Sequence, residues 1–240
     1  MAPAGSEAKA RRPISPWNTL LSPAQQLRQE TILRAATEIF LDGGYEAASM
    51  SAIAARLGGS KGTLYNYFRS KEELFAAVIQ HQCDRKLAIM FEGLETLDDD
   101  LVKGLRILAH RFATVLLSDD TMRFSRALAA SAENFPELGQ LMYEAGVLQT
   151  LRRLADYLEH QMAQARLKTA DSRRAAEQFL DLTLAGLYRR RLWNVAPGVR
   201  ESDIADNVDA AIEIFLAAYQ LHPRSTAEAA RAEERPQSRS

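Results

Sequence analysis

The chain has 240 residues, 47% of them hydrophobic and 25% charged, a composition that predicts a folded protein of one large or two modest domains. No apolar run approaches the ~20 residues of a membrane span, and no apolar segment of a secretory signal follows the first basic residues, so we expect a cytoplasmic protein that does not enter the membrane. Lys and Arg number 30 against 31 Asp and Glu, and a single cysteine, Cys83, excludes an intrachain disulfide and a Cys-based zinc cluster.

The two ends of the sequence differ in composition from the rest. Residues 1–21 are rich in Ala, Arg, Pro and Ser without sustained periodicity, which predicts a flexible arm. Arg11 and Arg12 belong either to a solvated tail or to a basic arm that reaches along DNA. Residues 223–240 have no bulky apolar side chain and are expected to form a disordered tail.

A first helix is predicted to begin after Ser22, a favourable N-cap that Pro23 follows at the first helical position. Apolar residues recur three and four positions apart until Gly43 and Gly44, which predict its end. This stripe consists of Ile32, Ala35, Ala36, Ile39 and Phe40.

Two short helices are predicted next. The first begins after Ser49, carries Ile53, Ala54 and Leu57 on one face and ends at Gly58 and Gly59. The second begins at Ser60 and directs Leu64, Tyr67 and Phe68 toward a core.

The rest of the chain is predicted to be helical as well. Ser70 is the expected N-cap of a longer helix from Lys71, and apolar residues then keep returning at helical spacing with no strand-like alternation. The fold class is therefore all-α. Breaks are expected near residues 97–100, 118–120, 134–136, 169–171 and 196–202.

Residues 51–67 have the features of a helix-turn-helix, in which the second helix enters the major groove with its N-terminus near the bases. Gly58 can adopt the positive φ that ends the first helix, and Ser60 can cap the second while its hydroxyl stays near a phosphate. The outward face of the second helix would present Lys61, Gly62, Tyr65 and Asn66.

This segment is also locally cationic, although the net charge of the chain is only −1. Between Ser49 and Lys71 the basic residues are Arg56, Lys61, Arg69 and Lys71, and there is no Asp or Glu. Such a window favours contact with a phosphate backbone.

The run SKGTLYNYF at 60–68 is followed by SKEEL at 70–74, and a run of this length with intact spacing is a specific signal. Through this run, residues 28–78 closely resemble the TetR family of transcriptional regulators. Other matching residues are Thr31-Ile32-Leu33, Ala35-Ala36, Phe40, Gly44-Tyr45, Ile53-Ala54 and Gly58. Gly59 departs from the branched apolar residue usual in the turn, and Ala52 from the acid that often completes the cap, which predicts a less rigid helix-turn-helix.

By this resemblance, Ser49, Thr63, Tyr67 and Lys71 would bind phosphates, whereas Lys61, Gly62 and Tyr65 would face base edges. Tyr67 and Phe68 fit a core role equally well. Lys71 could be an ordinary first-turn residue, but a cation at a helix N-terminus opposes the helix dipole unless an anion lies nearby, which favours a phosphate there. The implied partner is a double-stranded DNA operator.

Residues 84–222 resemble TetR C-terminal domains, and residues 123–193 resemble the AefR-like branch through ENFPEL at 133–138 and AAEQFL at 175–180. The resemblance implies a small-molecule effector of unknown identity. Candidate pocket residues are the aromatic Phe112, Phe124, Tyr143 and Tyr188 with the polar His110 and Glu133, all of which are equally compatible with plain core or surface positions.

The last two long helices are the candidates for a homodimer interface. One stripe consists of Phe179, Leu182, Gly186 and Trp193, where Ala185 and Gly186 allow close approach, and the other of Ile204, Val208, Ile212, Phe215 and Tyr219. The alternative is that both stripes only close the core of one subunit. We favour the dimer because one recognition helix offers too little contact for a specific site, whereas a two-fold dimer spans two half-sites about 34 Å apart or a multiple of that.

The sequence thus predicts a flexible arm at 1–21, a three-helix DNA-binding domain with a helix-turn-helix at 22–80, a larger helical-bundle domain for ligand binding and dimerisation at 81–222, and a tail at 223–240. We expect a ligand-responsive repressor that binds a palindromic operator, with no catalytic residue, metal or cofactor.

Two rival classes stay open. A helical enzyme or metal protein is disfavoured because His81 and Cys83 lie on different helix faces and the other histidines lack metal-ligand spacing. No phosphate loop, dinucleotide motif or nucleophile elbow is present either. A helical interaction protein that keeps the helix-turn-helix only as structure would bind DNA weakly and without salt dependence.

Overall fold

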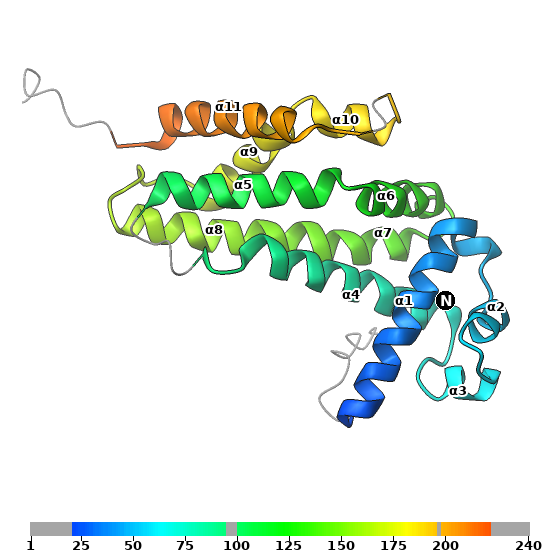
Figure 1. The fold of residues 1–240 in the computed structure, drawn as a ribbon. Coiled ribbons are helices and arrows are strands. Elements are labelled where there is room, and N and C mark those ends of the chain that lie inside the picture. The colour runs from blue at the N-terminus through cyan, green and yellow to red at the C-terminus, as the bar shows by residue number, and fades with distance from the viewer. Residues whose placement is uncertain (1–20, 95–99, 196–197, 222–240) are drawn as a thin grey trace, which may run out of the picture.

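The computed structural model describes residues 21–94, 100–195 and 198–221, and the predicted all-α class is confirmed for them (Figure 1). The one extended pairing there is an isolated bridge between Leu167 and Gln220. Residues 1–20 of the expected arm, with Arg11 and Arg12, and the expected tail at 223–240 lie outside the described residues. No helix in the described ranges has the length and apolar character needed to cross a membrane.

The order of the helices follows the predicted starts closely. In chain order they are α1 (Pro23–Ala47), α2 (Met50–Arg56), α3 (Lys61–Tyr65), α4 (Lys71–Phe91), α5 (Leu101–Leu117), α6 (Asp119–Ala132), α7 (Pro136–Met142), the π-helical segment η2 (Tyr143–Val147), α8 (Leu148–Ala163), α9 (Ser172–Leu184), α10 (Leu187–Leu192) and α11 (Glu201–Tyr219).

Helix α1 shows how local chemistry sets these boundaries. The hydroxyl of Ser22 accepts a hydrogen bond from the Gln25 backbone N–H, and the Gln25 side chain accepts one from the Ser22 N–H at 2.9 Å. This reciprocal pair satisfies two N–H groups that a helix start leaves open. Gly44 has a φ of 75°, so the helix is interrupted there and one more helical turn follows.

Two hydrophobic cores hold the molecule together. The first joins α1 to α4 around Phe40, Ile53, Leu64 and Phe68, and it also takes in Phe124 and other residues from α6, α7 and η2. The second core lies among α5, α8, α9 and α11, and the end of α4 joins it. Helix α4 therefore contributes to both cores.

The helices divide the molecule into an elongated bundle and a smaller projecting part (Figure 1). In the bundle, α5 packs against α4 and α11, and α9 packs against α8 and α11. Helices α1, α2 and α3 lie at one end, where α1 packs on α4 and α6. The lower part of α1 and all of α3 lie farthest from the bundle (Figure 1).

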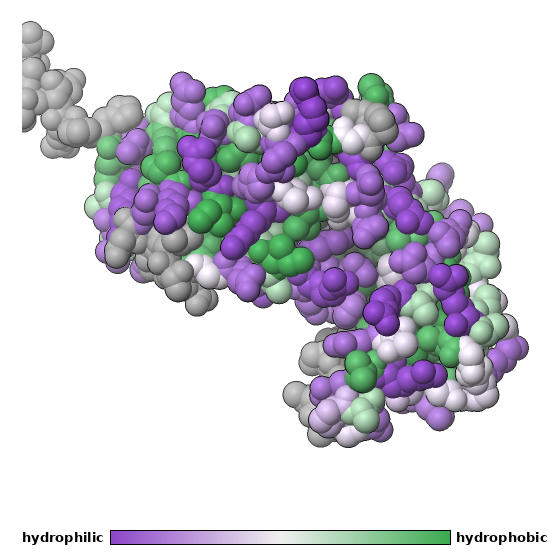
Figure 2. Space-filling model, viewed as in Figure 1, coloured by the Kyte–Doolittle hydropathy of each residue, from purple (hydrophilic) through white to green (hydrophobic). Residues whose placement is uncertain are grey.

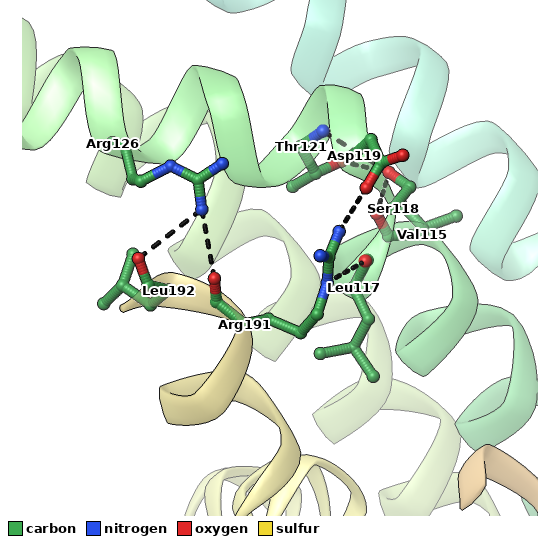
Figure 3. A network of polar contacts seen from close by, with 8 residues as sticks. All are labelled: Val115, Leu117, Ser118, Asp119, Thr121, Arg126, Arg191 and Leu192. Carbon is green, nitrogen blue, oxygen red and sulfur yellow. Dashed lines mark hydrogen bonds and ion pairs between the residues drawn. The ribbon is translucent and has the colours of Figure 1, made fainter. Parts of the chain in front are cut away.

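Two arginines, Arg191 on α10 and Arg126 on α6, attach α10 to the α5–α6 junction, and each reaches across to the other helix (Figure 3). The buried guanidinium of Arg191 donates to the Leu117 carbonyl at the end of α5 and pairs with Asp119 in the first turn of α6. In return, Arg126 of α6 donates to the carbonyls of Arg191 and Leu192 at 3.0 and 3.4 Å. Cations beside the carbonyls that end a helix are favoured by its dipole.

The prediction of one helix through Phe179 and Trp193 is wrong. Helix α9 ends at Leu184, and Gly186 then adopts a φ of 76°, which bends the chain before α10 begins. Trp193 lies beyond the end of α10 with 74% of its surface exposed. The glycine that we interpreted as a site of close helix packing is instead the break between two helices.

Candidate nucleic-acid interface

Helices α2 and α3 form a helix-turn-helix in which each start is capped by serine. The Ser49 hydroxyl accepts from the Ala52 N–H at 3.2 Å, and the Ser60 hydroxyl accepts from the Thr63 N–H at 3.2 Å. Between the helices, Gly58 has a φ of 62°, a left-handed conformation that a residue with a Cβ adopts only at a cost. The turn thus depends on the glycine that the sequence indicated.

Helix α3 separates buried from exposed residues sharply. Leu64 is buried in the first core, whereas Lys61, Gly62, Tyr65 and Asn66 are exposed. Tyr65 has 48% of its surface exposed, so its ring is available for contact with a partner. The end of the molecule that carries α3 presents pale and hydrophobic surface among strongly hydrophilic residues (Figure 2).

The phosphate-binding candidates lie around this exposed face. Ser49 and Ser60 are exposed caps, and the Thr63 hydroxyl lies 3.2 Å from the Ser60 hydroxyl. Tyr67 is half-buried against the first core, and its neighbour Phe68 is fully buried, which agrees with a core role for Phe68. The structure therefore brings the hydroxyls of Ser60 and Thr63 together beside the recognition helix.

Lys71 is already engaged within the chain. Its ammonium donates to the carbonyls of Tyr45 and Glu46 at 3.0 and 3.4 Å, and it lies 4.3 Å from the centre of the Tyr45 ring. These carbonyls belong to the last turn of α1, where a cation is favoured. The argument that Lys71 needs an external anion is therefore wrong, and its contact with phosphate stays a prediction.

A second contact joins the same two elements. The Tyr45 hydroxyl donates to the Glu72 carboxylate at 3.1 Å. Burial raises the pKa of Tyr45, and the neighbouring Glu72 carboxylate raises it further, so the phenol keeps its proton. Hydrogen bonds from the Glu72 backbone N–H and from Ser70 lower the pKa of Glu72. The end of α1, which precedes the helix-turn-helix, is thus joined directly to the start of α4, which follows it.

Arg28 is a neighbour of this site that the sequence pattern did not indicate. Arg28 is a half-exposed residue of α1, and a Cβ added to Gly59 would lie 3.4 Å from its guanidinium nitrogen. Arg28, Gly59, Ser60 and Thr63 border one narrow crevice together with apolar residues of α1, α2 and α3. The run of basic residues between Ser49 and Lys71 gave no signal for it, because Arg28 is far away in the sequence.

The six candidate pocket residues are not brought together. Phe124 belongs to the first core and Phe112 to the second, and Tyr188 packs at the edge of the second. His110 contacts the Glu201 carboxylate through its Nε2 near the surface, while Glu133 is exposed at the end of α6 and Tyr143 has 49% of its surface exposed. The six residues therefore do not line one pocket in this structure, and the prediction that they do is corrected; which residues bind an effector stays untested.

Most of the predicted dimer stripe is also corrected. The structure buries Phe179, Ile204, Val208, Ile212 and Phe215 in the second core of one subunit. Leu182 and Tyr219 are partly buried, and Gly186 and Trp193 are exposed but separated from α9 by the chain bend. For the five buried residues, the alternative that they close the subunit's own core is the correct one.

An outer face of α9 and α11 is mostly apolar. It carries Ile214, with 54% of its surface exposed, with Ala185, Ala218 and the half-buried Leu182 of the predicted stripe; Gln178 and Asp181 lie at the same groove. These residues line a shallow groove of about 420 Å³ between the two helices. Exposed apolar surface of this kind on neighbouring helices is typical of an interaction face.

Comparison with known proteins assigns both parts of the chain. Residues 32–78 match the family described as "Bacterial regulatory proteins, tetR family". Residues 103–221 match the family described as "AefR-like transcriptional repressor, C-terminal domain".

Individual relatives agree with these matches. The transcriptional activator FasR of Mycolicibacterium smegmatis is 44% identical over 73 residues, which cover 30% of this chain and only 33% of FasR. The transcriptional repressor KstR of Rhodococcus jostii is 26% identical over 205 residues, covering 82% of this chain and 86% of KstR. The solved structure of the flavonoid-responsive regulator FrrA is 34% identical with a TM-score of 0.72, and the match covers 83% of this chain and 100% of that chain.

Proposed function

The chain belongs to the TetR family of DNA-binding transcriptional regulators, and on this premise we propose that it is a ligand-responsive repressor that binds a palindromic operator as a homodimer. The observation that carries the proposal is the exposed face of α3, where Lys61, Gly62 and Tyr65 have no role in the core. A cation and an aromatic hydroxyl flanking a bare backbone suit contact with base edges in the major groove.

We place the surrounding hydroxyls on the phosphate backbone. Ser49, Ser60 and Thr63 would set the register of α3, with Asn66 and Tyr67 at its far end. The division into a DNA-binding domain at 22–80 and a bundle domain at 81–222 is part of the proposal. The two cores change over on α4 between Cys83 and Leu87, near this boundary, although the first core also takes in Phe124, Leu128, Leu138 and Ala145 of the bundle domain.

The homodimer would form through the exposed faces of α9 and α11. Their apolar residues Leu182, Ala185, Ile214 and Ala218 lie on neighbouring helices, so two subunits related by a two-fold axis would pack as a four-helix interface. Two recognition helices held in this way would contact two half-sites about 34 Å apart or a multiple of that.

Response to an effector would act through α4. This helix packs on α1 and also on α5 and α7, so a ligand that favours one position of α4 would shift the DNA-binding helices of both subunits. The mechanism requires only that the ligand binds one arrangement more tightly than the other. A ligand that stabilises the protein but leaves its operator affinity unchanged would contradict this coupling.

The test begins by selecting the bound fragments from genomic DNA with the full chain. Mobility-shift titrations then compare the wild type with Tyr65→Ala and Lys61→Ala. Each good base contact is worth about 1–3 kcal/mol and both half-sites lose it, so we expect specific binding to disappear while folding is retained. Retained affinity for the selected fragment would count against the assignment of α3.

Two matched substitutions serve as controls. Tyr143→Ala removes an aromatic residue with 49% exposure, close to the 48% of Tyr65, from the start of η2, which packs on α4, α7 and α8. Lys103→Ala removes an exposed lysine from α5. Both should bind the selected fragment as the wild type does, because neither lies near α3.

A further inference from the structure

The turn of the helix-turn-helix contains two glycines, and the backbone requires only the first. Gly58 has a φ of 62°, whereas the φ of Gly59 lies outside the left-handed region, so a residue with a side chain could adopt its conformation. Backbone conformation therefore does not explain why a glycine occupies position 59.

The space beside Gly59 is taken by a guanidinium. A Cβ at Gly59 would lie 3.4 Å from Nη2 of Arg28, which is ordinary contact for a single methyl group. A branched side chain extends further into the same space and would displace the guanidinium. Gly59 thus lets a cation from α1 lie directly against the turn.

Arg28 is half-exposed, and no hydrogen bond or ion pair joins its guanidinium to a residue in the part of the chain that the structure describes. The neighbouring window from Ser49 to Lys71 contains no acid. Arg28, Ser60 and Thr63 border the same narrow crevice, whose other walls are mainly apolar, and the hydroxyl oxygens of Ser60 and Thr63 lie 3.2 Å apart.

We propose that Arg28 binds a backbone phosphate of the DNA together with the hydroxyls of Ser60 and Thr63, and that Gly59 is the residue that allows it to do so. A guanidinium with adjacent hydroxyls is well suited to phosphate oxygens, because it offers several donors in a fixed fork. The inference rests on the proposed function and adds a contact from α1 to it. Arg28 acts here as a positioning residue that fixes the register of α3 and does not select a base.

The first test measures the salt dependence of binding to a mixed-sequence DNA duplex, on which phosphate contacts act whatever the sequence. Each neutralised phosphate contributes about 0.9 to the slope of log K against log salt concentration. Arg28→Ala should therefore lower this slope by about 0.9 for each subunit bound, and weaken binding severalfold at low salt. Arg34→Ala, which removes the same charge from an exposed site on the same helix, should leave the slope unchanged.

The second test uses the turn itself. Gly59→Ile should reduce the slope as Arg28→Ala does, whereas Gly59→Ala should bind like the wild type. In the double variant the two losses should not add, because both remove the same contact. Circular dichroism and the mass in solution verify that each variant keeps the fold and assembly of the wild type.

Opposite outcomes separate this inference from the proposed function. A wild-type slope in a folded Arg28→Ala variant, or fully additive losses in the double variant, overturns the inference while operator selection by the wild type still supports a regulator. A wild type that binds DNA without salt dependence and selects no fragment overturns both.

Discussion

At the scale of single residues, Lys71 illustrates how one side chain can satisfy a sequence motif for a structural reason. It matches a family position expected to bind phosphate, yet its ammonium lies on the Tyr45 and Glu46 carbonyls at the end of α1. The contact joins α1 to α4 on either side of the helix-turn-helix. An effect of its removal on DNA binding would therefore combine a lost phosphate contact with a looser attachment of these helices.

Unfolding by urea separates the two roles. Lys71→Met should lower the free energy of unfolding by about 1 kcal/mol, because it removes a charged hydrogen bond to two carbonyls that end a helix. Lys61→Met removes the same charge from an exposed position of α3 and should change stability by less than about 0.5 kcal/mol. Equal stabilities of the two variants would show that the Lys71 contact is of no structural importance.

At the scale of elements, the starts of the first helices could be predicted because their causes are local. Ser22, Ser49, Ser60 and Ser70 each accept a hydrogen bond from a backbone N–H three residues later, and this requires nothing outside one turn. The outward face of α3 was predictable for the same reason, since Leu64 fixes which side is buried.

The elements that sequence reasoning missed depend on distant neighbours. The role of Arg191 exists only because α10 lies against the end of α5, and Arg28 reaches the turn only because α1 crosses it. Likewise, Phe215 is apolar whether it faces its own core or another subunit, so periodicity cannot separate the two. Five residues of the predicted dimer stripe therefore belong to the core of one subunit, and the interface itself stays a prediction.

The bend at Gly186 can be tested as an element. Gly186→Ala introduces a Cβ at a φ of 76°, where it meets no atom within 4 Å, so the cost comes from backbone conformation alone. We expect a loss of roughly 1–2 kcal/mol in the free energy of unfolding. Gly198→Ala also meets no atom within 4 Å and has no positive φ, so it should be neutral or slightly stabilising.

At the scale of the whole molecule, a specific site requires two copies of α3 at a fixed distance, and a single chain carries one. The bundle offers one candidate surface for pairing two chains, because α9 and α11 pack on each other and leave an apolar groove of about 420 Å³ on their outer side. The other exposed apolar residues are spread over several elements, among them Ile89 on α4 and Val102 on α5. The arrangement favours an interface far from α3, so that DNA and the partner subunit do not compete for one surface.

Ile214→Glu tests this arrangement, since Ile214 is 54% exposed and its substitution should leave the second core intact. Light scattering should give the wild type a mass of twice 26.7 kDa and the variant a mass of one chain, because a dimer would bury the new carboxylate without a partner. The monomeric variant should also fail to bind the selected operator, because it has only one recognition helix.

Ile89→Glu, at 48% exposure on α4, is the control and should stay dimeric. A dimeric Ile214→Glu variant would place the interface elsewhere on the molecule, and a monomeric wild type would remove the two-fold model of operator binding altogether.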